Sequence, residues 1–203
     1  MKKKIATELV SSGCYVKAKD IDKKEIVTST NDTVIAYLSC RLAISNVELR
    51  KMLIEKLSQV VNSEYGNNIT LVGMATAGIP WATGIAEKLD IPMIYLRSSD
   101  KKYGLGGCIE GNIKDIPKDV VIVDDVFCTG STVNYGKEKL EENGLSVLGG
   151  IFIANLSDKN KKEYNDVKLN YLTTYKEIIN EAKKQKIIND QEYSIMKKVY
   201  KRY

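Results

Sequence analysis

The chain has 203 residues, of which 43% are hydrophobic and 28% charged, and its formal net charge is +5. This length and composition are typical of one globular α/β domain with a sizeable core. Histidine is absent, which excludes catalytic schemes with a histidine base and metal sites with histidine ligands. Any chemistry therefore has to use carboxylates, lysines, backbone amides or an oxygen-bound metal.

The N-terminus predicts neither secretion nor membrane insertion. Its basic residues, MKKK, are not followed by an apolar run long enough for a signal peptide, and no segment approaches the roughly 18 apolar residues of a membrane helix. We therefore expect a cytoplasmic protein without membrane contact. In such a compartment, cysteines without CxxC spacing are expected to be reduced thiols rather than bridges or metal ligands. The cysteines are Cys14, Cys40, Cys108 and Cys128.

Two helices are predicted in the first third of the chain. Residues 2–12 read as a short helix that ends near Gly13, and residues 45–62 read as a longer one with Ser45 or Asn46 as its cap. Residues 25–44 alternate weakly between polar and apolar, which predicts short strands over an irregular segment. The expected apolar face of the longer helix comprises Val47, Leu49, Met52, Leu53, Leu57 and Val60.

From residue 69 onward, short apolar strands alternate with helices. ITLVGMA, PMIYLR, VVIVDD and SVLGGIFIANL read as strands, whereas WATGIAEKL and TVNYGKEKLEENG read as helices. This alternation predicts a parallel sheet covered by helices on both faces. Ligands of such sheets bind outside the carboxyl ends of the strands, so we expect the functional residues at that edge.

The positive charge of the chain is concentrated at its C-terminus. Residues 182–203 hold seven Lys or Arg and two acidic residues, which accounts for the whole excess. Apolar residues recur there at helical spacing, so we expect an amphipathic helix that packs on the domain, and no nucleic-acid binding. These residues are Tyr193, Met196, Val199, Tyr200 and Tyr203.

The stretch VVIVDDVFCTGSTV, residues 120–133, combines an apolar strand, two acidic residues and a small, hydroxyl-rich turn. Backbone amides, hydroxyls and the start of the next helix at residues 129–132 can together bind a phosphate. Asp124 and Asp125 repel each other, so their pairing favours a ligand with donors, such as the hydroxyls of a ribose. The stretch lacks the residues of a P-loop and of a dinucleotide fingerprint. An ordinary capping arrangement is the alternative.

This stretch closely resembles the phosphoribosyl pyrophosphate (PRPP) motif of type I phosphoribosyltransferases. Three further segments resemble the orotate phosphoribosyltransferases among them: CRLAISNVELRKMLIE their segment after the hood, MATAGIPWATGIAEKLDIPMIYLR their pyrophosphate loop and next strand, and YGLGGCIEG the end of their mobile loop. The resemblance covers about residues 5–190. It implies a type I phosphoribosyltransferase fold, a central mostly parallel sheet flanked by helices, in a single domain over residues 1–203. It also implies a small N-terminal hood, formed by about residues 1–45 plus a C-terminal helical segment of about residues 175–203.

The resemblance also implies an activity: transfer of the 5-phosphoribosyl group from PRPP to orotate, giving orotidine 5′-monophosphate and pyrophosphate, with Mg²⁺ as cofactor. It implies a homodimer in which the lid of one subunit, residues 98–111, reaches the neighbouring site. Gly104, Gly106, Gly107 and Gly111 would give the lid its mobility.

The residues that the resemblance implies for the site fall in four segments. Lys101, Asp124 and Asp125 would be catalytic, and Mg²⁺ would be held mainly by substrate and water, near the two aspartates. The residues expected to bind PRPP are Thr76, Ala77, Gly78, Arg97, Lys101, Lys102, Asp124, Asp125, Cys128, Thr129, Gly130, Ser131 and Thr132.

Two departures from the family pattern concern the base. Tyr103 stands where the family usually has a histidine, and residues 29–34 lack the glycine and proline usual in the hood. These differences leave open a related enzyme that uses another base, and a noncatalytic PRPP-sensing regulator.

Several of these residues also have a structural interpretation. Lys101 can be a solvated loop lysine, and Arg97 can pair with Glu110 or Asp100. Cys128 can be merely a small residue beside the phosphate site, and residues 75–78 can be a tight turn. We expect Tyr37 to belong to the core.

Overall fold

The computed structural model describes residues 1–28, 32–98, 107–157 and 160–200. Its centre is a seven-stranded sheet in the order β10-β11-β9-β8-β5-β6-β7, in which only the two outermost pairs, β10–β11 and β6–β7, are antiparallel. The α/β class and the mostly parallel sheet predicted from the sequence are therefore confirmed. The strands are β5 (Thr70–Met74), β6 (Met93–Leu96), β7 (Ile109–Glu110), β8 (Asp119–Phe127), β9 (Ser146–Asn155), β10 (Glu163–Tyr164) and β11 (Val167–Thr174).

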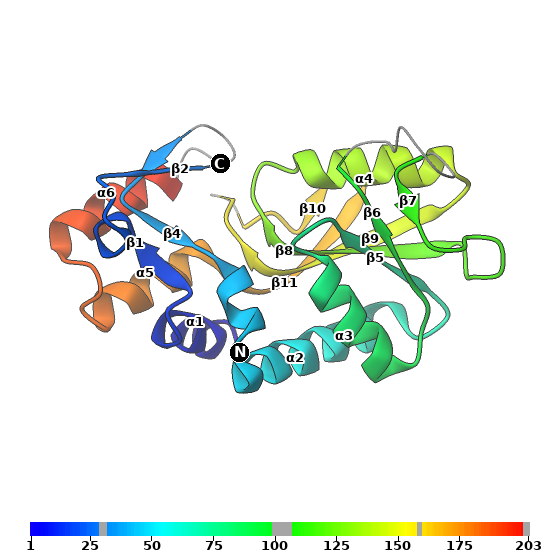
Figure 1. The fold of residues 1–203 in the computed structure, drawn as a ribbon, viewed down its shortest axis with the longest axis horizontal. Coiled ribbons are helices and arrows are strands. Elements are labelled where there is room, and N and C mark those ends of the chain that lie inside the picture. The colour runs from blue at the N-terminus through cyan, green and yellow to red at the C-terminus, as the bar shows by residue number, and fades with distance from the viewer. Residues whose placement is uncertain (29–31, 99–106, 158–159, 201–203) are drawn as a thin grey trace.

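Helices cover both faces of this sheet (Figure 1). On one face lie α2 (Val47–Tyr65) and α3 (Ile79–Leu89), and on the other lies α4 (Ser131–Glu142). Because side chains alternate along a strand, β8 contributes to both cores. Val121 and Val123 belong to the cluster with α2 and α3, whereas Ile122 belongs to the cluster with α4.

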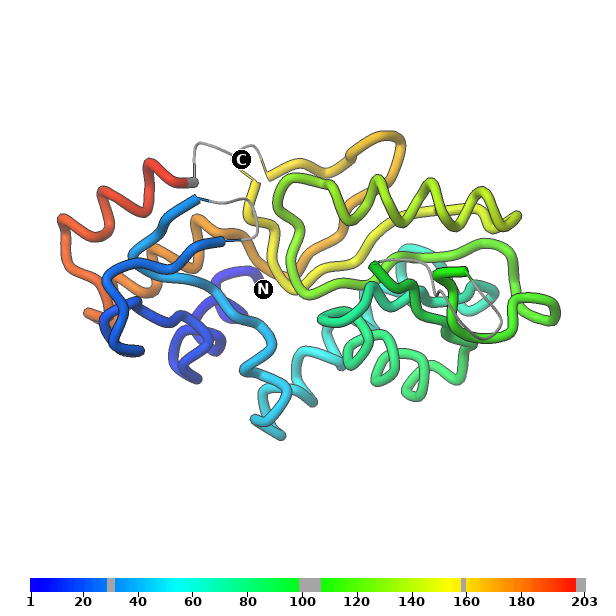
Figure 2. The backbone as a smooth tube through the Cα atoms, turned by 45° about the horizontal axis from the view of Figure 1, so that its top comes forward, coloured from blue at the N-terminus to red at the C-terminus, as the bar shows by residue number. Residues whose placement is uncertain are grey.

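The remaining elements gather beyond one end of the sheet (Figures 1 and 2). The pair β1–β4 and the pair β2–β3 are both antiparallel. Packed with them are α1 and two helices from the other end of the chain, α5 and α6. The elements are α1 (Lys2–Ser11), β1 (Tyr15–Lys17), η1 (Ala18–Ile21), β2 (Ile26–Val27), β3 (Thr33–Val34), β4 (Ala36–Leu38), η2 (Cys40–Ile44), α5 (Tyr175–Lys184) and α6 (Asp190–Tyr200), where η denotes a 3-10 helix.

A buried lysine joins the two ends of the chain in this region. The Nζ atom of Lys17 donates to the carbonyl oxygen of Ile187 at 2.7 Å and pairs with the carboxylate of Glu192 at 2.9 Å. The side chain of Lys17 is 8% exposed and that of Glu192 is 20% exposed. Such a pair is shielded from solvent, and it fixes α6 against the strand β1.

The predicted helices and strands are largely confirmed, and the differences concern single residues. The first helix ends at Ser11, and the side chain of Asn46 caps α2 by accepting from the backbone N–H of Leu49. Residues 25–44 contain short strands, as expected. Val47 was predicted on the apolar face of α2 but is 46% exposed, because it is the first residue of the helix and lies before the stretch that meets the sheet. Val61 is buried instead.

The C-terminal helix packs as its sequence pattern predicts. Met196 and Val199 are buried in the main core, and the Tyr193 hydroxyl donates to Asn180 Oδ1 at 2.7 Å. All four cysteines are free thiols. No helix in the part of the chain that the structure describes is long and apolar enough to cross a bilayer.

Candidate active site

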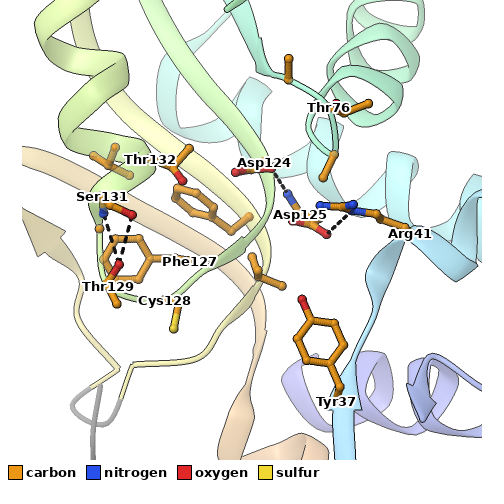
Figure 3. Close-up of a pocket in the computed structure, with 16 residues that line it drawn as sticks. Tyr37, Arg41, Thr76, Asp124, Asp125, Phe127, Cys128, Thr129, Ser131 and Thr132 are labelled. Carbon is orange, nitrogen blue, oxygen red and sulfur yellow. Dashed lines mark hydrogen bonds and ion pairs between the residues drawn. The ribbon is translucent and has the colours of Figure 1, made fainter. Parts of the chain in front are cut away.

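A cavity of about 330 Å³ lies at the carboxyl ends of the central strands. Four parts of the chain line it: β4 with η2, the loop after β5, the segment from Asp124 to Val133, and Phe152 on β9 (Figure 3). This is the edge at which parallel sheets bind ligands, and it is where the sequence predicted the functional residues.

One wall of the cavity is the turn between β8 and α4. Gly130 has a φ of +94°, which favours glycine, and it precedes α4, whose first residues line the cavity. The Oγ atoms of Thr129 and Ser131 lie 3.2 Å apart and Thr132 lines the same wall. Amides at a helix start and clustered hydroxyls favour an anion such as phosphate.

The middle of the cavity is formed by the two acidic residues predicted from the sequence (Figure 3). Asp124 accepts a 2.8 Å hydrogen bond from the backbone N–H of Asp125, and Asp125 is 9% exposed. Burial is the main cause that raises the pKa of both carboxyls above their ordinary value, and the charge of Asp125 raises the pKa of Asp124 further. Ionising this buried pair is unfavourable in the ligand-free protein. The pair is therefore suited to a ligand that donates hydrogen bonds or carries positive charge.

The opposite wall comes from the N-terminal part of the chain. Tyr37 on β4 and Arg41 on η2 line the cavity, and the Arg41 Nε atom lies 4.0 Å from Asp125 Oδ2. The expectation that Tyr37 belongs to the core is wrong, since this residue is 37% exposed and its ring borders the cavity. Its neighbours on β4, Ala36 and Leu38, are the buried ones, because alternate residues of a strand point to opposite sides.

The loop after β5 forms the third side. Ala75, Thr76 and Ala77 line the cavity, and the peptide bond between Ala75 and Thr76 is cis. Gly78 does not line it. A Cβ atom on Gly78 would lie 2.1 Å from the carbonyl oxygen of Val123, so this glycine lets the loop pack directly on β8.

Arg97 faces a second cavity of about 240 Å³, which shares Ala75, Ser131 and Thr132 with the first. Its guanidinium lies 3.4 Å from the carboxylate of Glu110. This ion pair is one of the two that the structural interpretation of Arg97 predicted. The Arg97 side chain is still 40% exposed, so the pairing leaves donors free to reach a ligand.

Lys101, Lys102 and Tyr103, together with Gly104 and Gly106, lie outside the described residues. Cys128 lines the main cavity, where burial raises the pKa of its thiol to about 11. The thiol is therefore protonated at neutral pH, which does not favour its use as a nucleophile.

Several cavity residues were not identified in the sequence. They are Arg41 and the apolar residues Val126, Phe127, Val133 and Phe152. Val126, Phe127 and Val133 lie within the motif at residues 120–133, but they were read there as apolar residues of the strand and the helix. No local pattern distinguishes Arg41 from the other cations of the chain.

The acidic residues of the cavity can supply only some of the oxygen ligands that Mg²⁺ needs. No group of three or more cysteine and acidic side chains gathers as a metal site among residues 1–28, 32–98, 107–157 and 160–200. Two neighbouring carboxylates beside hydroxyls are nevertheless the oxygen donors that Mg²⁺ accepts when waters and phosphate oxygens complete its shell. The residues present thus fit a metal that arrives with its substrate.

Comparison with known proteins agrees with this geometry. Residues 41–187 match the family model described as phosphoribosyl transferase domain. The orotate phosphoribosyltransferase of Fusobacterium nucleatum is 37% identical over 164 residues, which are 79% of this chain and 77% of the relative. That of Lactobacillus johnsonii is 35% identical over 188 residues, 86% of this chain and 88% of the relative.

Solved structures show the same fold. The orotate phosphoribosyltransferase of Aeropyrum pernix has a TM-score of 0.70 and 24% identity, covering 91% of this chain and 99% of its own. The UMP synthase of Leishmania donovani has a TM-score of 0.80 and 20% identity, covering 99% of this chain and 42% of that longer one. With the cavity, the family model and these relatives in agreement, the chain belongs to the phosphoribosyltransferase family, in the group of the orotate phosphoribosyltransferases.

Proposed function

We propose that this protein is an enzyme that transfers the 5-phosphoribosyl group of PRPP to orotate, giving orotidine 5′-monophosphate and pyrophosphate in pyrimidine nucleotide biosynthesis. The observation that carries this proposal is the order of groups along one cavity. A phosphate-binding turn, a buried carboxylate pair and a wall with an aromatic ring and a guanidinium follow one another across it (Figure 3).

This order matches the parts of a ribose 5-phosphate. The 5′-phosphate binds at residues 129–132, where amides, hydroxyls and the start of α4 converge. Asp124 and Asp125 accept hydrogen bonds from the two vicinal hydroxyls of the ribose. Pyrophosphate lies along Ala75, Thr76 and Ala77, where small side chains let it approach the backbone, and within reach of Arg97.

In the reaction, the bond between C1′ and the pyrophosphate oxygen breaks and pyrophosphate keeps its electron pair. A ring nitrogen of the base supplies the electron pair of the new bond to C1′. The protein needs no nucleophile for this step, in agreement with the absence of histidine. Its residues hold the sugar in place and stabilise the separated charges. Mg²⁺, held near Asp124 and Asp125 by substrate and water, supplies positive charge to the pyrophosphate oxygens when it is bound.

The lid completes this proposal. Lys101, with Lys102, provides positive charge to the leaving pyrophosphate, and the enzyme is a cytoplasmic homodimer in which the lid of each subunit covers the site of the other. The whole chain, residues 1–203, forms one domain, with a hood made of about residues 1–45 and 175–203. The packing of α1 and β1 against α5 and α6 supports this division.

An assay of PRPP-dependent pyrophosphate release with orotate, uracil, xanthine, hypoxanthine and guanine tests the function. We expect release with orotate and Mg²⁺, and none when either is omitted. The double variant Asp124→Asn/Asp125→Asn, purified in parallel, controls for a contaminating enzyme of the host. Release with another base in place of orotate would support the related enzyme suggested by Tyr103 and by residues 29–34. Tight PRPP binding without release with any base would support the regulator.

A further inference from the structure

The cavity carries a single positive side chain among the described residues that line it, and within the described part of the chain this side chain has no hydrogen-bonding partner. Arg41 contributes this charge, whereas Asp124 and Asp125 contribute two carboxyls. The 4.0 Å between Arg41 Nε and Asp125 Oδ2 is within reach of an ion pair and too long for a hydrogen bond. The guanidinium is also 67% exposed. Its donors are therefore available to a ligand.

The position of Arg41 relates it to the base and not to the phosphate. In a ribose 5-phosphate, C1′ and C5′ lie at opposite ends of the ring, and the two hydroxyls lie between them on one edge. The phosphate lies at residues 129–132, the hydroxyls at the aspartates and the leaving pyrophosphate along residues 75–77. The base approaches C1′ from the side opposite the pyrophosphate, so it lies at the remaining wall. Tyr37 and Arg41 form that wall (Figure 3).

The charge of the base requires such a group. A carboxylate on the base would enter a cavity that already holds two acidic groups, so without a cation its binding would be opposed by repulsion and by loss of hydration. A guanidinium matches a carboxylate with two parallel hydrogen bonds. A neutral pyrimidine offers only carbonyl oxygens, which lack the negative charge and the paired geometry of a carboxylate.

We infer that Arg41 binds the carboxylate of the base and thereby makes the enzyme selective for a carboxylated pyrimidine. This inference rests on the proposed function and assigns a selectivity residue to it. Tyr37, on the same wall, offers its ring as an apolar surface beside the pyrimidine.

The test compares two ligands that differ only in the carboxylate, orotidine 5′-monophosphate and uridine 5′-monophosphate. Their affinities are measured by calorimetry for the wild-type protein and for Arg41→Gln. We expect Arg41→Gln to lower the affinity for orotidine 5′-monophosphate by about 10- to 100-fold, which is the usual effect of losing hydrogen bonds to a charged group. Uridine 5′-monophosphate and PRPP should bind to both proteins within about threefold.

Two further variants sharpen the comparison. Arg41→Lys keeps the charge but not the paired donors, so it should retain part of the preference for the carboxylated nucleotide. Lys51→Gln removes one exposed positive charge from α2, outside the cavity, and should change neither affinity. Since Arg41 is exposed, circular dichroism and thermal unfolding should show all three variants folded.

Three results would overturn the inference. One is an equal loss of affinity for both nucleotides in Arg41→Gln, which would make Arg41 a partner of Asp125. Another is a loss confined to PRPP, which would assign it to pyrophosphate. The third is an unchanged preference for the carboxylated nucleotide. In each case, activity of the wild-type enzyme with orotate would leave the proposed function standing. If the wild-type protein neither uses orotate nor prefers the carboxylated nucleotide, the proposed function and the role of Arg41 are both overturned.

Discussion

The ring of Tyr164 lies against Gly130, so closely that a Cβ atom on the glycine would be 2.4 Å from the tyrosine Cε1 atom. Tyr164 is held in place by an edge contact with Phe127 and by a hydrogen bond of 3.2 Å from Asn134 to its hydroxyl. The turn at residues 129–132, proposed to bind phosphate, is therefore packed against β10, a strand that begins more than 30 residues later in the chain.

This contact makes Gly130→Val a severe change. The side chain would collide with Tyr164 and would also require a backbone conformation that β-branched residues rarely adopt. We expect the affinity for ribose 5-phosphate, measured by calorimetry, to fall by at least about 100-fold. Gly144→Val is the control, since Gly144 has a φ of +74° and no atom within 4 Å of its Cβ position. It shares the strain but not the collision, so equal losses in both variants would refute the role of the turn.

A trade-off between binding and stability is expected at Asp124. Asp124→Asn should weaken PRPP binding but raise the midpoint of thermal unfolding of the ligand-free protein. Because burial raises the pKa of this carboxyl in the folded state, the unfolded chain releases the proton first, above about pH 4. The aspartate then destabilises the fold increasingly as the pH rises toward its raised pKa.

The gain from Asp124→Asn should accordingly be larger at pH 8 than at pH 4. Asp119→Asn, at the exposed start of the same strand, is the matched control and should show neither effect. Unchanged PRPP affinity in Asp124→Asn would remove this residue from the site. A midpoint that falls equally at both pH values would contradict the electrostatic argument.

The pair formed by Lys17 and Glu192 predicts the opposite dependence on pH. Burial raises the pKa of Glu192, but the backbone N–H of Asn189 and the Lys17 ammonium lower it by more, so the net shift is downward. The ionised Glu192 therefore stabilises the fold fully at pH values above its pKa in the unfolded chain. This stabilisation is lost as the pH falls through the lower, folded-state pKa. Glu192→Gln should cost about 1–3 kcal/mol of unfolding free energy at pH 7, and the difference from wild type should shrink below about pH 4.

Urea unfolding at pH 7 and pH 3 measures this difference. Glu138→Gln is the comparison, because Glu138 is an exposed residue whose pairing with Lys139 at 3.5 Å is open to solvent and should contribute little. A cost for Glu192→Gln that is the same at both pH values would show that the contribution comes from packing and not from charge.

Lys101 is expected to act across a dimer. Lys101→Ala should lower turnover by about 10²–10³, the usual effect of removing one preorganised charge-stabilising group, with PRPP affinity within several-fold of wild type. Mixed with the double variant Asp124→Asn/Asp125→Asn, it should regain about a quarter of wild-type activity, because half the dimers are hybrids with one complete site. No recovery despite demonstrated subunit exchange would mean that the lid serves its own subunit or that Lys101 has no part in turnover.

The features that the sequence predicts well are formed by residues that are close together in the chain. Asp124, Asp125 and residues 129–132 follow one strand and precede one helix, so a single strand, turn and helix brings them together, and the apolar pattern of β8 and α4 identifies that unit. The parallel sheet follows from repetition of the same unit. Gly78 was predicted to bind PRPP, whereas its close packing on β8 is visible only in the structure.

The other wall of the cavity could not be predicted in the same way. Arg41 and Asp125 are 84 positions apart in the numbering, and their approach depends on how η2 packs against the end of β8. Tyr37 lies in a strand of three residues, too short for alternation to indicate which side faces the core. Contacts of this kind are set by tertiary packing, which a local pattern does not contain.

The tie from Lys17 to Ile187 and Glu192 has a consequence for biosynthesis. The ribosome makes β1 and β4 early, but the helices that pack against them, α5 and α6, emerge last. A nascent chain can therefore assemble the sheet and its phosphate turn while the wall that carries Tyr37 and Arg41 still lacks its support. Release from the ribosome is then the step that completes this wall of the cavity, and a chain truncated before residue 187 would lack the contacts that support it.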